Sequence, residues 1–69
     1  MPLTLAEKGA ENTIKRIGGK DDIRHFLGNL GFVVGATVVV LSEFGGNLIV
    51  LVKNSRIAIT KDMAKKIII

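Results

Sequence analysis

The stretch Thr37–Thr60 reads TVVVLSEFGGNLIVLVKNSRIAIT, and it carries the strongest strand pattern of the chain. Its first two runs, Thr37–Glu43 and Leu48–Lys53, are nearly unbroken apolar strands separated by Phe-Gly-Gly-Asn, and a third run, 54–59, follows at once. Strands joined by such short turns pair antiparallel, because a parallel return needs a crossover of a dozen or more residues. The sequence therefore predicts a three-stranded antiparallel meander.

Weaker patterns on either side predict the other strands. Glu11–Ile17 alternates well enough for a first strand, which two glycines terminate. Thr60 is placed to cap a short helical turn, and residues 67–69 read as a last strand. Five short strands in one small domain favour a barrel, because closure removes exposed sheet edges. The predicted fold class is all-β, a five-stranded barrel with one inserted α-helix and a C-terminal helical turn before the last strand.

The inserted helix is predicted over residues 20–30. Its apolar residues recur at the i, i+3, i+4, i+7 spacing of one helical face. Gly31 is expected to end it in the left-handed conformation, with Phe32 packing back on Leu27. Gly28 lies inside the helix, where glycine is unfavourable, so we expect another backbone to pass closely there.

Composition limits the classes of protein that fit. The 69 residues make one domain, 1–69, and the absence of Cys excludes disulfides and thiolate metal sites. The longest apolar stretch, Leu30–Leu41, is interrupted by glycines and is far shorter than the roughly 20 residues of a spanning helix. The segment 1–7 lacks the pattern of a signal peptide, so a cytoplasmic location is expected.

The predicted strands carry more apolar residues than one buried face needs. If one set of alternate residues faces the interior, the period of two sends a second apolar set outward. Either the inserted helix or the segment Leu3–Leu5 covers that second set, or it is a docking surface for a partner. The inward set is Val38, Val40, Leu48, Val50 and Val52, and the outward set is Val39, Leu41, Ile49 and Leu51.

Two motifs resemble a known family. They are Leu-Gly-Phe-x-x-Gly at 30–35 and Ile-Ala-Ile-x-x-x-x-Ala-x-x-Ile at 57–67, and together with 37–40 they resemble the FeoA family over essentially the whole chain. The resemblance implies an SH3-like barrel and a cytoplasmic accessory protein of bacterial ferrous-iron uptake. It also implies a partner, the FeoB membrane transporter with its cytosolic GTP-binding domain, with a homo-oligomer as a further expected assembly. Many relatives carry Pro before the third strand, where this chain has Gly46-Asn47.

Residues that carry chemistry are few. His25 is the only His, and Asp21 and Asp22 lie three or four positions before it, which is enough for a weak surface site for a divalent metal and no more. No cofactor is expected. Gly45-Gly46 is read as a hairpin turn, because neither a helix nor a Lys-Ser or Lys-Thr pair follows it. Without Cys, and without Ser near the one His, the chain is not expected to be an enzyme.

Two alternatives to the transport function stay open. The net charge of +4 suggests a small basic barrel that binds nucleic acid. The chain has no Trp or Tyr, however, on which bases could stack. The other alternative is a transition-metal-binding domain, related to the SH3-like domain of iron-dependent repressors.

The partner-binding residues are predicted at the helix end and the first hairpin. Phe44 precedes the glycine turn, where a large aromatic has few core neighbours, and exposed aromatics at loop tips are typical binding anchors. The predicted apolar lip consists of Leu30, Phe32, Phe44 and Gly46.

Overall fold

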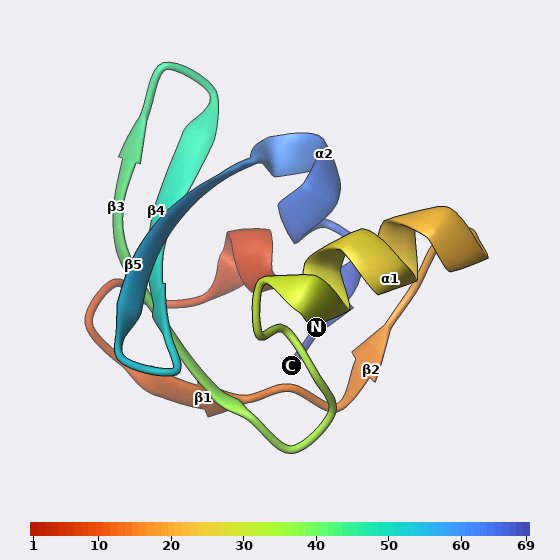
Figure 1. Cartoon of the computed structure of the whole chain (residues 1–69). Coiled ribbons are helices and arrows are strands. Elements are labelled where there is room, and N and C mark those ends of the chain that lie inside the picture. The colour runs from red at the N-terminus through yellow and green to blue at the C-terminus, as the bar shows by residue number, and fades with distance from the viewer.

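A computed structural model describes all 69 residues as one small body (Figure 1). The four-stranded antiparallel sheet has the order β1-β3-β4-β5, and a second, two-stranded sheet pairs β2 with β6. The two termini lie side by side, and the Met1 amino group donates to the Ile69 carbonyl at 2.9 Å. In chain order the elements are the 3₁₀ turn η1 (Leu3–Leu5), β1 (Glu11–Thr13), β2 (Arg16–Ile17), α1 (Asp21–Asn29), β3 (Thr37–Phe44), β4 (Asn47–Val52), β5 (Ser55–Thr60), α2 (Lys61–Ala64) and β6 (Ile67–Ile68).

The predicted fold class, mostly β with one inserted helix, is confirmed, but the first strand is divided and the strand ladders do not close. The expected strand 11–17 is divided into β1 and β2, because the chain changes sheets at Ile14 and Lys15. The Ile14 amide donates to the Ala36 carbonyl at 2.9 Å, beside β3, whereas the Lys15 amide donates to the Ile68 carbonyl at 2.7 Å, on β6. The structure therefore has six short strands in two sheets, and their ladders do not form one closed ring.

Both turns of the meander have two residues with positive φ. Gly45 and Gly46 have φ of 57° and 82°, and Lys53 and Asn54 have φ of 50° and 63°. Two left-handed residues are the mark of a type I′ turn, whose twist matches that of the flanking strands. The meander predicted from 37–60 is confirmed, and its second turn uses Lys53-Asn54 rather than glycine.

One face of the meander builds the core. The inward residues predicted from the alternation are all buried, together with residues from η1, α1, α2 and β6. Figure 1 shows why only this face is covered, since both helices and η1 lie on one side of β3, β4 and β5. The buried residues are Leu3, Ile14, Leu27, Phe32, Val38, Val40, Leu48, Val50, Val52, Ile59, Ala64, Ile67 and Ile69.

The end of α1 follows the sequence closely. The Phe32 amide donates to the Leu27 carbonyl at 3.0 Å and the Gly31 amide to the Gly28 carbonyl at 3.0 Å, which is the Schellman arrangement. Gly31 has φ of 107°, which a residue with a Cβ adopts only with strain. The expectation for Gly28 is wrong, because a Cβ built there would meet nothing within 4 Å.

The C-terminal helical turn is also confirmed. The Thr60 hydroxyl accepts a hydrogen bond from the Met63 amide at 3.2 Å, which caps α2 as predicted. Neither this turn nor the longer α1 has the length and apolar character needed to cross a bilayer.

Candidate functional surface

The outer face of the β3–β4–β5 sheet keeps an apolar surface in contact with solvent. The strand register places Glu11, Val39, Leu51 and Arg56 side by side across all four strands. Leu51 is 37% exposed even though its neighbours along β4 are buried. The sequence left two explanations for the outward apolar residues, coverage by another segment or a docking surface. In the structure neither α1 nor Leu3–Leu5 covers them. Leu3 is buried in the core, and both helices lie on the opposite side of the sheet (Figure 1).

Because of a β-bulge in β3, the apolar surface extends to the tip of the β3–β4 hairpin. The register of β3 against β4 shifts between Val40 and Ser42, so Leu41 has no partner. After the bulge Ser42 pairs with Ile49 and Phe44 pairs with Asn47. Because Asn47, Ile49 and Leu51 alternate with the buried residues of β4, the shift returns Phe44 to the outer face. We call Val39, Leu41, Phe44, Ile49 and Leu51 the outer apolar face.

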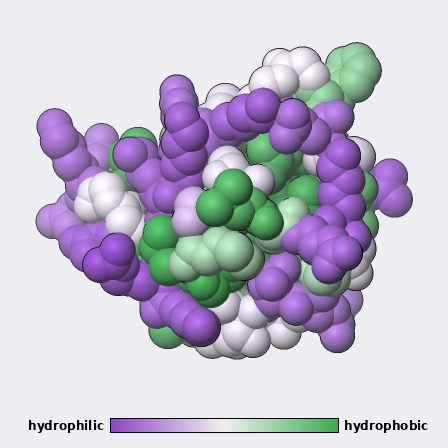
Figure 2. All heavy atoms as spheres, turned by 180° about the vertical axis from the view of Figure 1, so that it is seen from behind, coloured by the Kyte–Doolittle hydropathy of each residue, from purple (hydrophilic) through white to green (hydrophobic).

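Phe44 is the most exposed large apolar side chain of the molecule, at 81%. It lies at the end of the β3–β4 hairpin, which projects beyond the rest of the molecule in Figure 1. Seen from behind, apolar side chains gather near the middle of the surface, and another stands out at the upper right, where the hairpin ends (Figure 2). An aromatic ring in this position adds no core packing, so its apolar surface is free for contact with a partner.

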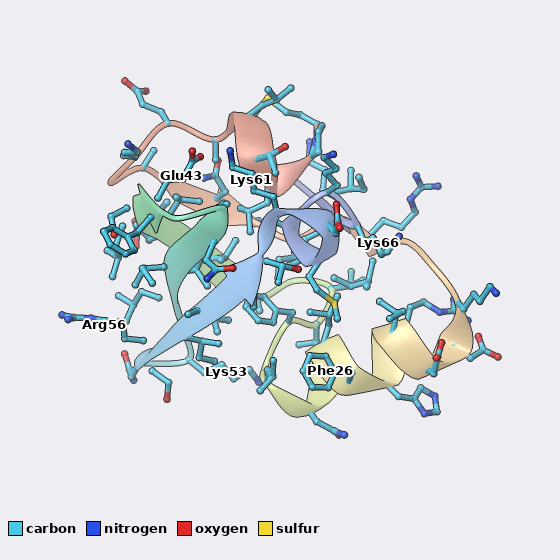
Figure 3. All side chains as sticks on the ribbon, turned by 90° about the horizontal axis from the view of Figure 1, so that it is seen from above. Phe26, Glu43, Lys53, Arg56, Lys61 and Lys66 are labelled. Atoms are coloured by element: carbon cyan, nitrogen blue, oxygen red, sulfur yellow. The ribbon has the colours of Figure 1, made fainter.

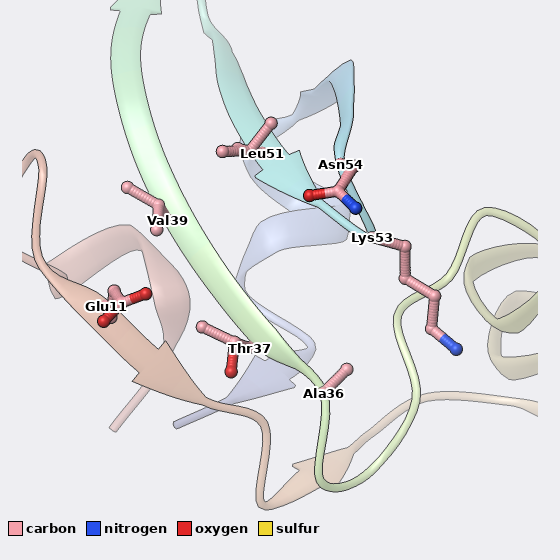
Figure 4. Close-up of a pocket in the computed structure, with 7 residues that line it drawn as sticks. All are labelled: Glu11, Ala36, Thr37, Val39, Leu51, Lys53 and Asn54. Carbon is pink, nitrogen blue, oxygen red and sulfur yellow. The ribbon is translucent and has the colours of Figure 1, made fainter.

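A shallow pocket of about 300 Å³ lies at the other end of the outer apolar face. Val39 and Leu51 lie at its centre, with Glu11 on one side and Lys53 on the other (Figure 4). An apolar floor between a carboxylate and an ammonium group suits an apolar side chain with polar neighbours, and the pocket contains no Cys, Ser or His that could act as a nucleophile or base. The remaining residues that line it are Ala36, Thr37 and Asn54.

The four residues of the predicted lip do not form one surface. Phe44 and Gly46 lie at the hairpin tip, where the Gly46 carbonyl accepts from the Lys61 amide at 3.1 Å. Leu30 packs against the core from the far end of the sheet, beside the β4–β5 turn, since a Cβ on Gly31 would meet Lys53 Cγ at 3.3 Å. Phe32 is only 1% exposed and is a core residue, held there by the Schellman hydrogen bond.

The weak metal candidates are spread along the first turns of α1. Asp21 forms an ion pair with Arg24, and an Asp22 carboxylate oxygen accepts from the Ile23 amide at 2.9 Å. His25 is exposed. No three His, Cys, Asp or Glu side chains come together in an arrangement that could hold a metal ion.

The basic residues do not form a stripe. Figure 3 shows Arg56 projecting from one side of the molecule and Lys66 lying on the other, while Lys61 Nζ is paired with a Glu43 carboxylate oxygen at 3.0 Å. Such dispersal is typical of solvated side chains, whereas nucleic-acid binders gather theirs on one face.

Sequence reasoning missed the pocket and the return of Phe44 to the outer face. The pocket draws residues from β1, the start of β3 and the β4–β5 turn, which meet only through the strand register. The type I′ turn at Lys53-Asn54 fixes the register of β4 against β5, and recognising it would have placed Arg56 beside Leu51. Nothing in the sequence marks Leu41 as a bulge.

Comparison with known proteins connects this architecture to one family. The model of the FeoA domain family matches residues 1–69. A crystal structure of an iron uptake regulatory protein, FeoA, is 29% identical, with a TM-score of 0.88 over 97% of this chain and 91% of that one. A zinc complex of FeoA from Stenotrophomonas maltophilia, described as a procaryotic SH3 domain protein, is 26% identical, with a TM-score of 0.85 over 99% and 87%.

More distant matches show the fold alone. A manganese-dependent transcriptional repressor is 20% identical, with a TM-score of 0.86 over 97% of this chain and 39% of that one. No curated protein matches the chain. The same small fold therefore occurs in proteins of different function, so the function has to be argued from this chain's own surface.

Proposed function

The chain belongs to the FeoA family over its whole length, a non-catalytic family linked to ferrous-iron transport, and from this premise we propose that it regulates or assists that transport as an interaction module. Its partner in this proposal is the cytosolic GTP-binding domain of the FeoB transporter. The module would act on the cytoplasmic side of the membrane by contact alone.

The observation that carries the proposal is the exposure of Phe44. A phenyl ring that is 81% exposed stabilises the folded chain little, because almost none of its apolar area leaves water on folding. Aromatic side chains dominate the energy of protein interfaces, where they bury a large area at a small cost in conformational entropy.

The outer apolar face extends this anchor into a surface. Leu41, which is 37% exposed, lies between the Phe44 tip and the pocket, and Leu51, also 37% exposed, lines the pocket. Interfaces typically surround a few buried apolar anchors with a polar rim. Here Glu11 and Arg56 supply that rim at the two ends of the row that contains Val39 and Leu51.

The test replaces Phe44 and compares the variant with a matched control. Phe44→Ala should leave the thermal melt nearly unchanged and weaken binding to the transporter's cytosolic domain by about tenfold or more. Val34→Ala is the control, because Val34 is also highly exposed but lies before the start of β3, at the opposite end of that strand. Calorimetric titration of both variants with the purified domain measures the difference.

Two results would contradict the proposal. Equal binding by the Phe44 and Val34 variants would remove the hairpin tip from the interface. A collapse of the Phe44→Ala melt would show that the ring stabilises the fold instead.

Metal binding is a second candidate function, favoured by the zinc complex of the Stenotrophomonas maltophilia relative. Because Asp21 is already paired with Arg24 and His25 has no second strong ligand beside it, we expect the domain alone to bind Fe²⁺, Mn²⁺ or Zn²⁺ only weakly. Calorimetry with each ion tests this. A one-to-one site of about micromolar affinity that is lost in His25→Ala would establish a metal function instead.

A further inference from the structure

The four-stranded sheet ends in an open edge at β5. In the order β1-β3-β4-β5, β5 pairs with β4 on one side and with no strand on the other. Figure 1 shows β5 as the last strand of this sheet, with no further strand beside it on the side away from β4. β5 has six residues, and all six pair with β4 without a bulge, so the free edge is regular.

The register identifies the backbone groups that face this edge. In a two-residue hairpin the residues that flank the turn, Val52 and Ser55, form a hydrogen-bonded pair, and every second pair along the ladder does the same. The same alternation requires Gly46 and Lys61 to be hydrogen-bonded, and the Lys61 amide does donate to the Gly46 carbonyl at 3.1 Å. The N–H and C=O groups of Arg56 and Ala58 therefore point away from β4.

These groups have no partner in the molecule. Neither Arg56 nor Ala58 takes part in any backbone hydrogen bond outside the regular elements, and no side chain bonds to them. Natural sheets protect such edges with charged side chains, Pro, a bulge, or a covering helix or loop. β5 has neither Pro nor a bulge, and its single charged side chain is Arg56. A row of free donors and acceptors is the template on which an extended peptide adds as a further strand.

Charge selects among the possible occupants. Residues 53–61 contain Lys53, Arg56 and Lys61 and no Asp or Glu, and Lys61 is already paired with Glu43, so Arg56 is the free charge within β5. In a symmetric pairing of two copies centred on Ala58, Arg56 of one copy would lie opposite Thr60 of the other, beside the Lys61 that is already paired with Glu43. A second copy therefore supplies no carboxylate to Arg56, whereas an acidic segment does, and opposite charges across a strand pair are favourable.

We infer that the open edge of β5 is a binding site for an extended acidic segment of a partner protein, which adds to the sheet as an antiparallel strand. The edge is distinct from the Phe44 tip, and the inference does not depend on FeoB being the partner.

The probe is a capped peptide, Glu-Thr-Val-Thr-Val-Glu, and its control is the same peptide with Lys in place of both Glu. The acidic peptide should bind more tightly than the basic one. In the complex, hydrogen exchange of the Arg56 and Ala58 amides should slow, while in the free protein both should exchange rapidly. Nuclear magnetic resonance measures both quantities on the folded chain, and the probe contains no part of the transporter.

Two substitutions separate strand addition from general attraction to a basic protein. Ala58→Pro removes a free N–H without breaking the β4 ladder, since proline is tolerated on an edge strand whose N–H faces solvent. It should weaken binding of the acidic peptide by about tenfold, whereas Ala58→Val, which keeps the N–H, should not. Arg56→Glu should weaken binding of the acidic peptide by about fivefold and strengthen binding of the basic peptide.

Three outcomes would overturn the inference. Wild-type binding by a folded Ala58→Pro variant would mean that the peptide lies elsewhere. Equal binding of the two peptides would remove the acidic preference. Slow exchange of the Arg56 and Ala58 amides in the free protein, with a dimeric mass, would mean that a second copy already occupies the edge.

Discussion

The two faces of β4 are built from the same kinds of residue, but one face is buried and the other is partly exposed to solvent. On the inner face Leu48 is 2% exposed, and Val50 and Val52 are buried as well. On the outer face Leu51 is 37% exposed, and Ile49 is only half-buried. Burial here therefore depends on what lies against a face, because the helices, η1 and β6 supply enough chain to cover one side of the sheet only.

The largest test of this comparison replaces a leucine on each face. Leu48→Ala should cost about 2 to 5 kcal/mol of unfolding free energy, because it leaves a cavity in the core. A core of this size supplies only about 3 to 5 kcal/mol in total, so the variant should be largely unfolded. Leu51→Ala should cost about 1 kcal/mol. Urea unfolding of the two variants measures both, and equal losses would mean that the outer face is covered in solution.

A smaller effect should separate stability from docking. Leu51→Thr keeps a β-branched side chain that suits a strand, and it places a hydroxyl on the outer apolar face. We expect unfolding free energy within about 1 kcal/mol of wild type and binding to the transporter's cytosolic domain weakened by about fivefold. Calorimetric titration beside the Val34→Ala control measures the binding. An unchanged affinity would restrict the interface to the hairpin tip.

The smallest expected effect is that of salt. Docking through apolar side chains releases few counterions, so raising salt from about 50 to about 200 mM should change the dissociation constant by less than about threefold. A protein that contacts six to ten phosphates loses roughly 10³ to 10⁵ in affinity over that range. Titrations at both salt concentrations decide this, and tight, steeply salt-dependent binding of single-stranded RNA or DNA would favour the nucleic-acid alternative.

Much of the fold could be predicted because its signals are local. A glycine pair between two alternating runs predicts a hairpin, and the left-handed Gly31 after an amphipathic run predicts the end of α1. The candidate surface was predicted less well. The place of Phe44 beside a turn predicts that its ring is exposed, and it is. Phe32 lies beside a turn as well, yet the hydrogen bond from its amide to the Leu27 carbonyl directs it into the core.

The antiparallel meander, the length and end of α1, and the two apolar faces of one hairpin all follow from the amino-acid sequence alone. These follow from backbone conformations and side-chain periods that a few neighbouring residues set. Tertiary packing and strand pairing fix which elements cover the inner face, where the first strand changes sheets, and how the bulge at Leu41 returns Phe44 to the outer face. They also leave β5 with an open edge. Each of these depends on pairing between residues far apart in the chain, and the local pattern of apolar and polar residues does not encode that pairing.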